Sequence, residues 1–490
     1  MIFHKKFIKH VSAMVAVIVA AIVAVSVLVP EKYVRVKNPV FITQCGENVV
    51  VIPNGKSKAE IGGRLVYFTA SMDGTVAAAL IRDVGDDNKF GYSLYLITDH
   101  PELISDGVDY FVLAGSGSAI AYCKNHNPNR AAPEATAELW LYSGGKSKML
   151  ANKFSALQGH DCAISPDGNT VAYTAHDGKK DIGFVWRGKA SKLGEDVYPF
   201  AVSNDAKFVY FYYTDTGDRY AYVQSGTNSD SRVKLGKDIS SIHANKDFSQ
   251  IIFVSGASSS YMSRNGGKAE PISGTFEYFI LPDNVTSQRL WMHAVAVYGI
   301  SDFSETYYRS FDDSLIYIDG DYKAYTVESD ISTAVCLSVD GKSLTYLKVG
   351  IIYKMDGKSA ATGAEIIVDG GVKAFAATSD GNAVFYTNDS GIYYKKGSGE
   401  PYTISTVNSD ISEGLLYGMF KGRTYFYVRD SKLYSSTGGK GAPVSGIDGN
   451  VQFFIAPPQF SKSSLLVSVT DGNDTLAYYS TDGTTFELIG

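Results

Sequence analysis

Residues 159–193 read GHDCAISPDGNTVAYTAHDGKKDIGFVWRGKASKL, and this stretch decides the fold. An apolar run at 162–164 is followed by the turn Ser165-Pro166-Asp167-Gly168 and by a second apolar run at 171–173. Residues 184–193 add a third apolar run, a Gly-Lys turn and a closing Leu. Short apolar runs separated by Pro, Asp and Gly predict antiparallel strands joined by hairpins. We therefore predict a small antiparallel meander here.

Two hairpin elements of this kind recur along the chain with a spacing near 40 residues. One joins an aromatic-containing strand through a turn rich in Gly, Lys or Asp to a short strand that ends in Leu, Ile or Val. Its copies are 142–150, 186–193, 222–235, 261–272, 317–327, 353–367, 393–404, 434–444 and 478–489, with a degenerate copy at 95–104. The other precedes it by about twenty residues, at 163–173, 200–210, 242–254, 334–346 and 374–386, and more loosely at 66–80, 111–122, 416–428 and 453–467. Two hairpins per unit predict four-stranded antiparallel blades, so the fold class is all-β and the architecture a β-propeller of about ten units.

The turn between the apolar strands carries a family signature. Ser165-Pro166-Asp167-Gly168 matches a Ser-Pro-Asp-Gly turn in full, and 203–206, 338–341 and 379–381 match it in part. In this the chain resembles the WD40-like, TolB-type propeller repeat family over most of residues 60–490. The resemblance implies the propeller fold and is specific only to the repeat. Gly159-His160 is similar to the start of a WD40 repeat, but no Trp-Asp closes the unit.

The number of rings stays open at this stage, because closed propellers usually have four to eight blades. Ten units form one large ring, two rings, or a smaller ring with inserted hairpins. The longest gap between repeats contains 279–308, which marks either a seam near 273–315 or an elaborated blade. We also expect residues 49–52 to pair with the last strand, 486–489, since an edge strand needs protection.

The N-terminus predicts a membrane anchor. Residues 11–29 carry no charge, and a helix of this length, at about 1.5 Å per residue, matches the roughly 30 Å hydrocarbon core. We expect residues 1–10 to be a cytoplasmic head, 11–29 a transmembrane signal anchor, 30–39 a linker and 40–490 the propeller. Three basic residues lie on each side of the span, so the orientation rests on the short basic head. Cleavage at the small residues 24–26 is the alternative to a retained, single-pass anchor in the cell membrane with the bulk of the chain extracytoplasmic.

Composition and cysteine content bear on whether the chain binds nucleic acid or zinc and on whether it forms disulfides. The chain has 490 residues, a net charge of -6 and 45 scattered Lys and Arg residues, so we expect no nucleic-acid partner. The 34 Tyr and 48 Gly suit strands joined by tight turns. Cys45, Cys123, Cys162 and Cys336 are far apart and do not predict a zinc site. We expect free buried thiols, and a Cys123–Cys162 disulfide stays open as an alternative.

Several motifs have the composition of a chemical site but are better explained as turns. Gly-Lys-Ser occurs at Gly55, Gly145, Gly341 and Gly357 without the preceding Gly of a phosphate-binding loop. Residues 480–486 resemble the Asp-box turn of sialidase-type propellers, and that box is itself structural.

Titratable side chains give weak candidates only. His160 with Asp161 and His176 with Asp177 have the composition of an acid–base pair, and Asp-rich turns at 86–88 and 215–218 offer oxygen ligands for calcium. We interpret all four as surface turns. No catalytic, cofactor-binding or metal-ligating residue is therefore assigned, and no cofactor is expected.

The predicted function is a noncatalytic binding or assembly scaffold for a protein or a cell-envelope polymer, because a propeller holds many loops on one rigid frame. The alternative is a surface glycan hydrolase or lyase with carboxylates converging on the channel. A cell-wall or peptide sensor is a third reading. Two carboxylates about 5 to 10 Å apart in one cleft favour the hydrolase, whereas a centre lined by apolar and aromatic residues favours the scaffold.

Overall fold

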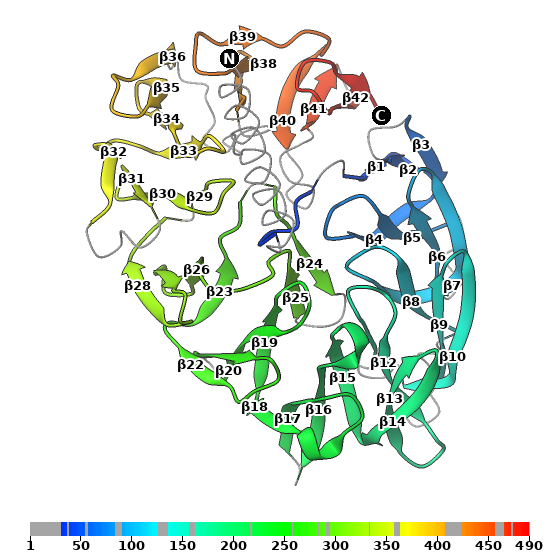
Figure 1. Cartoon of the computed structure of the whole chain (residues 1–490). Coiled ribbons are helices and arrows are strands. Elements are labelled where there is room, and N and C mark those ends of the chain that lie inside the picture. Colours follow the sequence, from blue (N-terminus) through cyan, green and yellow to red (C-terminus); the bar gives the residue numbers. More distant parts are fainter. Residues whose placement is uncertain are drawn as a thin grey trace, which may run out of the picture.

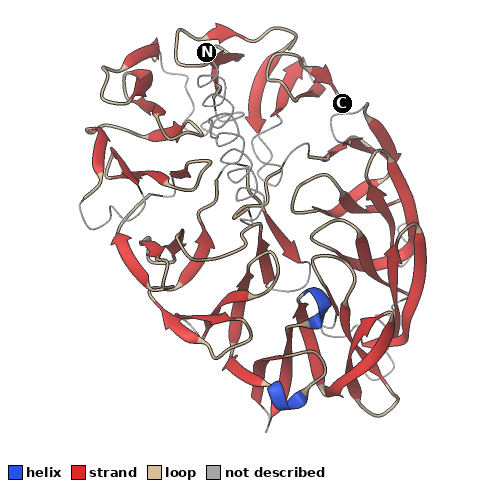
Figure 2. Ribbon diagram, viewed as in Figure 1, coloured by secondary structure: helices blue, strands red, loops and turns tan. Residues whose placement is uncertain are grey.

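The computed structural model describes residues 31–36, 39–53, 57–83, 91–125, 136–155, 162–215, 218–256, 258–282, 284–290, 295–332, 334–356, 363–406, 423–455, 465–471 and 474–489. Strands dominate these ranges, with two short 3-10 helices, Asn204–Ala206 and Ser229–Ser231 (Figure 2). Within them, no helix has the length and apolar character needed to cross a membrane. The predicted head and anchor, residues 1–29, lie outside the described residues.

The strands form units, here called blades, whose strands are lettered A to D from the centre of the ring outward. Blades 1 to 3 contain β1 (Phe41–Cys45), β2 (Asn48–Ile52) and β3 (Ala59–Gly62); β4 (Arg64–Ala70), β5 (Ala77–Arg82), β6 (Tyr92–Ile97) and β7 (Pro101–Leu113); then β8 (Ala119–Lys124), β9 (Thr136–Ser143) and β10 (Lys146–Ser155). Blades 4 to 6 contain β11 (Cys162–Ile164), β12 (Val171–His176), β13 (Asp181–Arg187) and β14 (Lys189–Glu195); β15 (Val197–Val202), β16 (Val209–Asp215), β17 (Asp218–Gln224) and β18 (Val233–Lys237); β19 (Ile239–Ala244), β20 (Gln250–Ser255), β21 (Ser259–Arg264) and β22 (Glu270–Ile272).

The remaining blades continue the same order. Blades 7 and 8 contain β23 (Phe276–Phe279), β26 (Thr306–Ser310), β27 (Leu315–Ile318) and β28 (Ala324–Glu328); β29 (Val335–Leu337), β30 (Ser343–Lys348), β31 (Ile351–Asp356) and β32 (Glu365–Val368). Blades 9 to 11 contain β33 (Ala374–Ala377), β34 (Ala383–Asn388), β35 (Gly391–Lys396) and β36 (Tyr402–Thr406); β37 (Tyr425–Arg429), β38 (Lys432–Ser436) and β39 (Ala442–Pro443); β40 (Asn450–Ile455), β41 (Leu465–Asp471), β42 (Asp474–Ser480) and β43 (Glu487–Leu488).

The blades follow one another in chain order round one ring (Figure 1). The described strands form nine sheets. One eleven-stranded sheet holds blades 2 to 4, because the long strand β7 is shared by blades 2 and 3 and the end of β10 in blade 3 pairs with β12 of blade 4. Its first half pairs with β6 as strand D of blade 2, and its second half pairs with β8 as strand A of blade 3. The predicted all-β architecture of antiparallel, mostly four-stranded units is confirmed. One unit, blade 1, has no counterpart among the predicted repeats.

Blade 1 lacks an A strand among the described residues. Only Gly63 separates β3 from β4, which is strand A of blade 2. In the same way, only Asp196 separates strand D of blade 4, β14, from strand A of blade 5, β15. By this comparison β3 is strand D of blade 1, and β1 and β2 are its strands B and C. Residues 31–36, which precede β1 at the position of an A strand, instead cross the centre of the ring. We call this segment the strap. It bridges Ile300 through Tyr33 and Val285 through Arg35.

The ring does not close by the expected strand pairing. Among the described residues β2 pairs with β1 and β3, and β43 pairs with β42, so the predicted pairing of 49–52 with 486–489 was wrong. Its physical reason is that β1 and β3 occupy both edges of β2. Side-chain packing takes the place of pairing, because Phe41 lies against Tyr479 with ring centroids 4.5 Å apart. Val50, Ile52 and Ile489 complete this cluster between blades 1 and 11.

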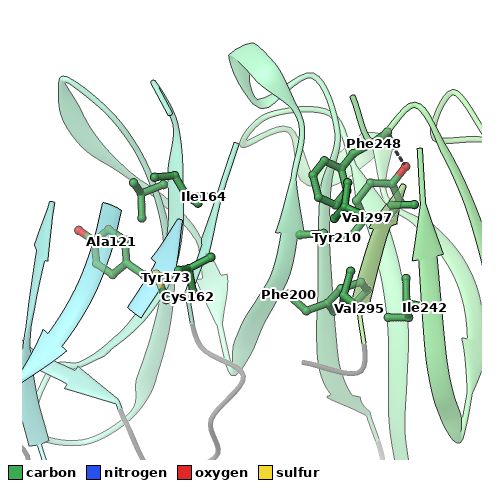
Figure 3. Packing of buried hydrophobic residues seen from close by; sticks show 14 of the residues in the cluster. Ala121, Cys162, Ile164, Tyr173, Phe200, Tyr210, Ile242, Phe248, Val295 and Val297 are labelled. Atoms are coloured by element: carbon green, nitrogen blue, oxygen red, sulfur yellow. Dashed lines mark hydrogen bonds between the residues drawn. The ribbon is translucent and has the colours of Figure 1, made fainter. Parts of the chain in front are cut away.

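The long gap between predicted repeats is an insertion into blade 7, between β23 and β26. Its hairpin, β24 (Ser287–Leu290) and β25 (Val295–Tyr298), adds to blade 6 because β25 pairs in parallel with the A strand β19. Val295 and Val297 are buried in the same core as Phe200 and Ile242 of blades 5 and 6 (Figure 3). We call β24–β25 the central hairpin.

The central hairpin and the residue before it also bond to blades 2 and 3. The buried Gln288 donates from Nε2 to the carbonyl oxygen of Leu113 at 3.0 Å, where β7 ends in blade 3. Thr286 Oγ1 donates to the carbonyl oxygen of Met72 at 3.2 Å, in the turn after β4. Inner strands of blades 2, 3 and 6 are thereby joined across the centre.

Candidate functional site

The family signature builds a turn whose polar groups bond to one another. The Ser165 hydroxyl donates to Asp167 Oδ1 at 2.6 Å, and the same hydroxyl accepts the amide of Thr170 at 3.0 Å. The amide of Asn169 also donates to Asp167 Oδ1. The same Ser/Thr-to-Asp bond occurs in the A–B turns of blades 2, 8 and 9, in the pairs Ser71–Asp73, Ser338–Asp340 and Thr378–Asp380. The signature therefore closes the turn between strands A and B.

These hydrogen bonds hold the turn carboxylates ionised. Burial opposes ionisation of Asp167, but the bonds from the Ser165 hydroxyl and from Asn169 outweigh it and lower the pKa of this carboxyl. The Ser338 hydroxyl likewise lowers the pKa of Asp340, and the Thr378 hydroxyl lowers that of Asp380. A carboxyl that is ionised and fully engaged by its own turn is a poor general acid. These aspartates are structural.

Replacing Asp167 by Asn is expected to lower the free energy of unfolding by about 1 kcal/mol at pH 7, because a charged acceptor of three bonds becomes a neutral one. The folded pKa of Asp167 is lowered, so its stabilisation is present above the unfolded pKa of about 3.9 and is lost as pH falls through the folded value. The difference between parent and D167N in thermal melting should therefore close below about pH 4.

Asp205 is the matched control, because it holds the equivalent place in blade 5 but contacts Arg187 of the neighbouring blade at the exposed surface. D205N should change the melting temperature little, since exposed ion pairs contribute about 0–1 kcal/mol. A D205N effect equal to that of D167N would contradict the structural role of the turn bonds.

The A–B turns of neighbouring blades are joined by hydrogen bonds. The amide of Met72 in blade 2 donates to the carbonyl oxygen of Gly115 in blade 3 at 2.8 Å, and Ser116 donates to Pro166 in blade 4 at 2.8 Å. The amide of Asp167 donates to Asn204 Oδ1 in blade 5 at 3.0 Å. We call the side of the ring that carries these turns the A–B face, and the side with the B–C turns the B–C face.

The Asp-box-like stretch and two of the Gly-Lys-Ser motifs are confirmed as turns. In the Asp-box-like stretch, burial of Asp482 is outweighed by hydrogen bonds from the amides of Thr484 and Thr485, which lower the pKa of its carboxyl. Gly145 and Gly341 have φ of +76° and +74° in hairpin turns. Gly55 and Gly357 lie outside the described residues.

His176 does not pair with Asp177, as the sequence had offered. It lies at the B–C turn of blade 4, where Nδ1 is 3.1 Å from Asp181 Oδ1 and Tyr198 donates to Asp181 Oδ2 at 3.1 Å. Asp177 instead accepts the amides of Lys179 and Lys180 as a turn residue. His176 Nε2 is buried without a hydrogen-bond partner among the described residues, so no nucleophile is aligned with it there. His160 and Asp161 lie outside the described residues.

The structure gives no support for a metal site at the candidate residues that it describes. Nowhere in the part of the chain that the structure describes do three or more His, Cys, Asp or Glu side chains form a group able to hold a metal ion. Residues 86–88 lie outside that part, and Asp218 accepts the Tyr220 hydroxyl at 3.2 Å. None of the four cysteines forms a disulfide, which supports the expected thiols over the disulfide alternative. Cys123 and Cys162 are buried as expected, whereas Cys45 and Cys336 are partly exposed. Burial raises the pKa of the Cys123 thiol well above its usual value.

The inner strands distinguish the two functional readings. In the described A strands carboxylates occur at two positions, Asp109 in blade 3 and Glu277 in blade 7, which are different parts of the ring. Glu277 accepts Arg309 Nη1 at 2.7 Å, and that guanidinium is almost fully buried. The other inner positions are mainly apolar, as in β15 and β33. No pair of carboxylates suited to glycoside hydrolysis is assembled by these strands.

Sequence reasoning located the extra segment 279–308 and offered an elaborated blade as one interpretation, but it did not place the central hairpin of that segment at the centre of the ring. It also missed the strap. The strap was assigned to a linker at 30–39, although Tyr33, Val34 and Val36 form an apolar pattern that a solvated linker does not need. Tyr33 is 4% exposed and Val36 8% exposed. This pattern was the available signal.

Comparison with known proteins does not identify a family. No protein-family model matches the chain, and no curated protein matches it. A crystal structure of the eukaryotic initiation factor is 10% identical, with a TM-score of 0.42, over 92% of this chain and 96% of that chain. TolB from Acinetobacter baumannii is 10% identical, with a TM-score of 0.28, over 66% of this chain and 77% of that chain. The GH74 enzyme of Niastella koreensis is 9% identical, with a TM-score of 0.31, over 93% of this chain and 86% of that chain. At these TM-scores the likenesses carry no argument about function.

Proposed function

We propose that this chain is a membrane-anchored, extracytoplasmic β-propeller that acts as a noncatalytic binding or assembly scaffold for a protein or cell-envelope ligand. One observation carries the proposal: the centre of the ring is occupied by the central hairpin and the strap, between inner strands that are mainly apolar. Recognition is then left to the loops and to the outer strands, which a rigid frame holds in fixed places.

The outer strands offer apolar contacts. Most of the exposed large apolar side chains in the described residues lie on D strands: Leu103, Met149, Tyr325, Ile366, Tyr402 and Leu488. Tyr325 and Tyr402 are 48% and 46% exposed, and tyrosine supplies contact area with a polar end. We call the D strands together the rim. Its apolar side chains and free strand edges suit an extended or sheet-edge protein partner.

Photo-crosslinking in living cells tests this function with the full chain. A benzoylphenylalanine at Tyr325, Ile366 or Tyr402 on the rim, or at Ser390 on the B–C face, is expected to give a discrete adduct of higher mass. The matched control is Asn382 at the other end of β34, on the A–B face, where we expect none. Purified full chain should release no reducing ends from cell-wall polymers. Polymer cleavage, with no adduct at any of these positions, would contradict the scaffold and favour the hydrolase.

A further inference from the structure

The strap is fixed to the ring by backbone hydrogen bonds. The amide of Val34 donates to the carbonyl oxygen of Gly299 at 2.7 Å, and the amide of Val36 donates to that of Asn284 at 2.8 Å. In return, the amide of Ser301 donates to the carbonyl oxygen of Lys32 at 2.8 Å. These hydrogen bonds form two isolated β-bridges with the insertion of blade 7, so the fold sets the direction of the chain at residue 31.

Hydrogen bonds of lysine side chains hold the strap to blades 6 and 7 at the level of the A–B turns. Lys32 Nζ donates to the carbonyl oxygens of Ser304 and Glu305 at 2.7 and 2.8 Å, directly before strand B of blade 7. Lys246, in the A–B turn of blade 6, donates to the carbonyl oxygen of Glu31 at 3.4 Å. The strap therefore starts on the A–B face.

Tyr33 makes the contact with blade 8, at its A–B turn. A Cβ placed on Gly341, whose φ is +74°, would lie 2.5 Å from the Tyr33 hydroxyl and 3.0 Å from its ring. This close approach requires glycine at the turn and leaves Tyr33 almost fully buried. At its other end the chain reaches blade 2, where the amide of Val40 donates to the carbonyl oxygen of Gly74 at 2.9 Å.

We propose that the A–B face is the face that rests on the lipid membrane, and that the strap sets this orientation. The inference deepens the proposed function and rests on its membrane anchor. Pro30 alone separates the predicted span, 11–29, from the fixed residue Glu31. One residue extends at most about 3.6 Å, so the chain has no linker that would let the ring turn over.

The charges of the A–B face do not decide its orientation. Lys207 and Lys342 are exposed at the A–B turns of blades 5 and 8, but Asp167 and Asp340 in the same kind of turn are ionised, because hydrogen bonds lower their pKa. The orientation therefore rests on the strap and on the point at which the chain leaves the ring. The B–C face then points away from the membrane, and the pair His176–Asp181 with it.

Fluorescence quenching by the membrane tests the orientation. The full chain is reconstituted in phosphatidylcholine–phosphatidylglycerol vesicles that contain a headgroup-attached nitroxide quencher. A dye is attached through a genetically encoded alkyne residue at Asn382 or at Ser390, which flank β34 on the A–B and B–C faces. Eight residues at about 3.3 Å each place the two dyes roughly 25 Å apart. Lys342 and Val349, which flank β30, form a second matched pair.

Quenching at Asn382 and Lys342 is expected to exceed that at Ser390 and Val349 by at least about threefold, because nitroxide quenching requires close approach to the headgroups. Equal quenching of both faces, or stronger quenching at Ser390 and Val349, overturns the orientation. Val34→Pro removes the amide that bonds to Gly299, and it should reduce the difference between the faces to less than about 1.5-fold. An unchanged difference in V34P overturns the role of the strap.

Carbonate-washed membranes separate this inference from the proposed function. A chain recovered in the soluble fraction overturns the anchor and with it the orientation. A chain that stays in the membrane pellet but shows the reverse quenching pattern overturns the orientation alone.

Discussion

Replacing Gln288 by Glu is expected to lower the free energy of unfolding by about 3–5 kcal/mol at pH 8. The buried Gln288 side chain donates to the Leu113 carbonyl across the centre of the ring. Glutamate has nearly the same shape, but it loses the donor and places a carboxylate against a carbonyl oxygen. Thermal melting of the full chain measures the change. A nearly neutral substitution would contradict the burial of this side chain at the centre of the ring.

Ser287→Glu is the matched control, since the neighbouring residue of the same strand is exposed. A surface charge there should change stability by less than about 0.5 kcal/mol. The two variants also differ in their pH dependence. Burial raises the folded pKa of the new carboxyl in Q288E above its unfolded value of about 4.3. The folded state of Q288E then keeps the carboxyl proton to a higher pH than the unfolded state does. The loss in free energy of unfolding relative to the parent is therefore smallest below pH 4.3 and grows as pH rises. In S287E the change in free energy of unfolding should not grow with pH in this way.

The blades could be predicted from the sequence because their information is local. The turn at Ser165–Gly168 separates β11 from β12 within about a dozen residues, and both strands are short apolar runs that are buried in the blade. The same local pattern located the A–B turns at 338–341 and 379–381, and the structure adds the hydrogen bonds that engage Asp340 and Asp380 there. Each of these features depends on side chains fewer than six residues apart.

The features that close the ring could not be read in this way, because each joins segments that are distant in sequence. Gln288 and Leu113 are 175 residues apart, and the strap bonds to residues more than 200 positions away. Blade 1 was missed because its A strand is replaced by the strap, so the spacing between turn signals is lost there. The place of the central hairpin was missed because it pairs with β19 in parallel, and no hairpin turn joins the two.

Replacing Phe41 by Ala is expected to destabilise the junction between blades 1 and 11 by about 3–5 kcal/mol. Phe41 is 2% exposed and its ring packs on Tyr479 at 4.5 Å, in the cluster that closes the ring without shared strands. If strand pairing closed the ring, F41A would remove only the packing of one side chain and the pairing would still hold blades 1 and 11 together. Here side-chain packing alone holds these blades together. We therefore expect β1 and β2 to open locally before the rest of the ring unfolds.

Native-state hydrogen exchange measures that opening. In F41A, the amides of β1 and β2 should exchange at least about a hundredfold faster, the ratio that corresponds to about 3 kcal/mol, while those of blades 4 to 6 keep their protection. Phe311→Ala is the control, because Phe311 is 66% exposed and its loss should change neither region. Uniform acceleration over all blades in F41A would show that the ring unfolds as one unit. The junction would then not be the weak point that packing without strand exchange requires.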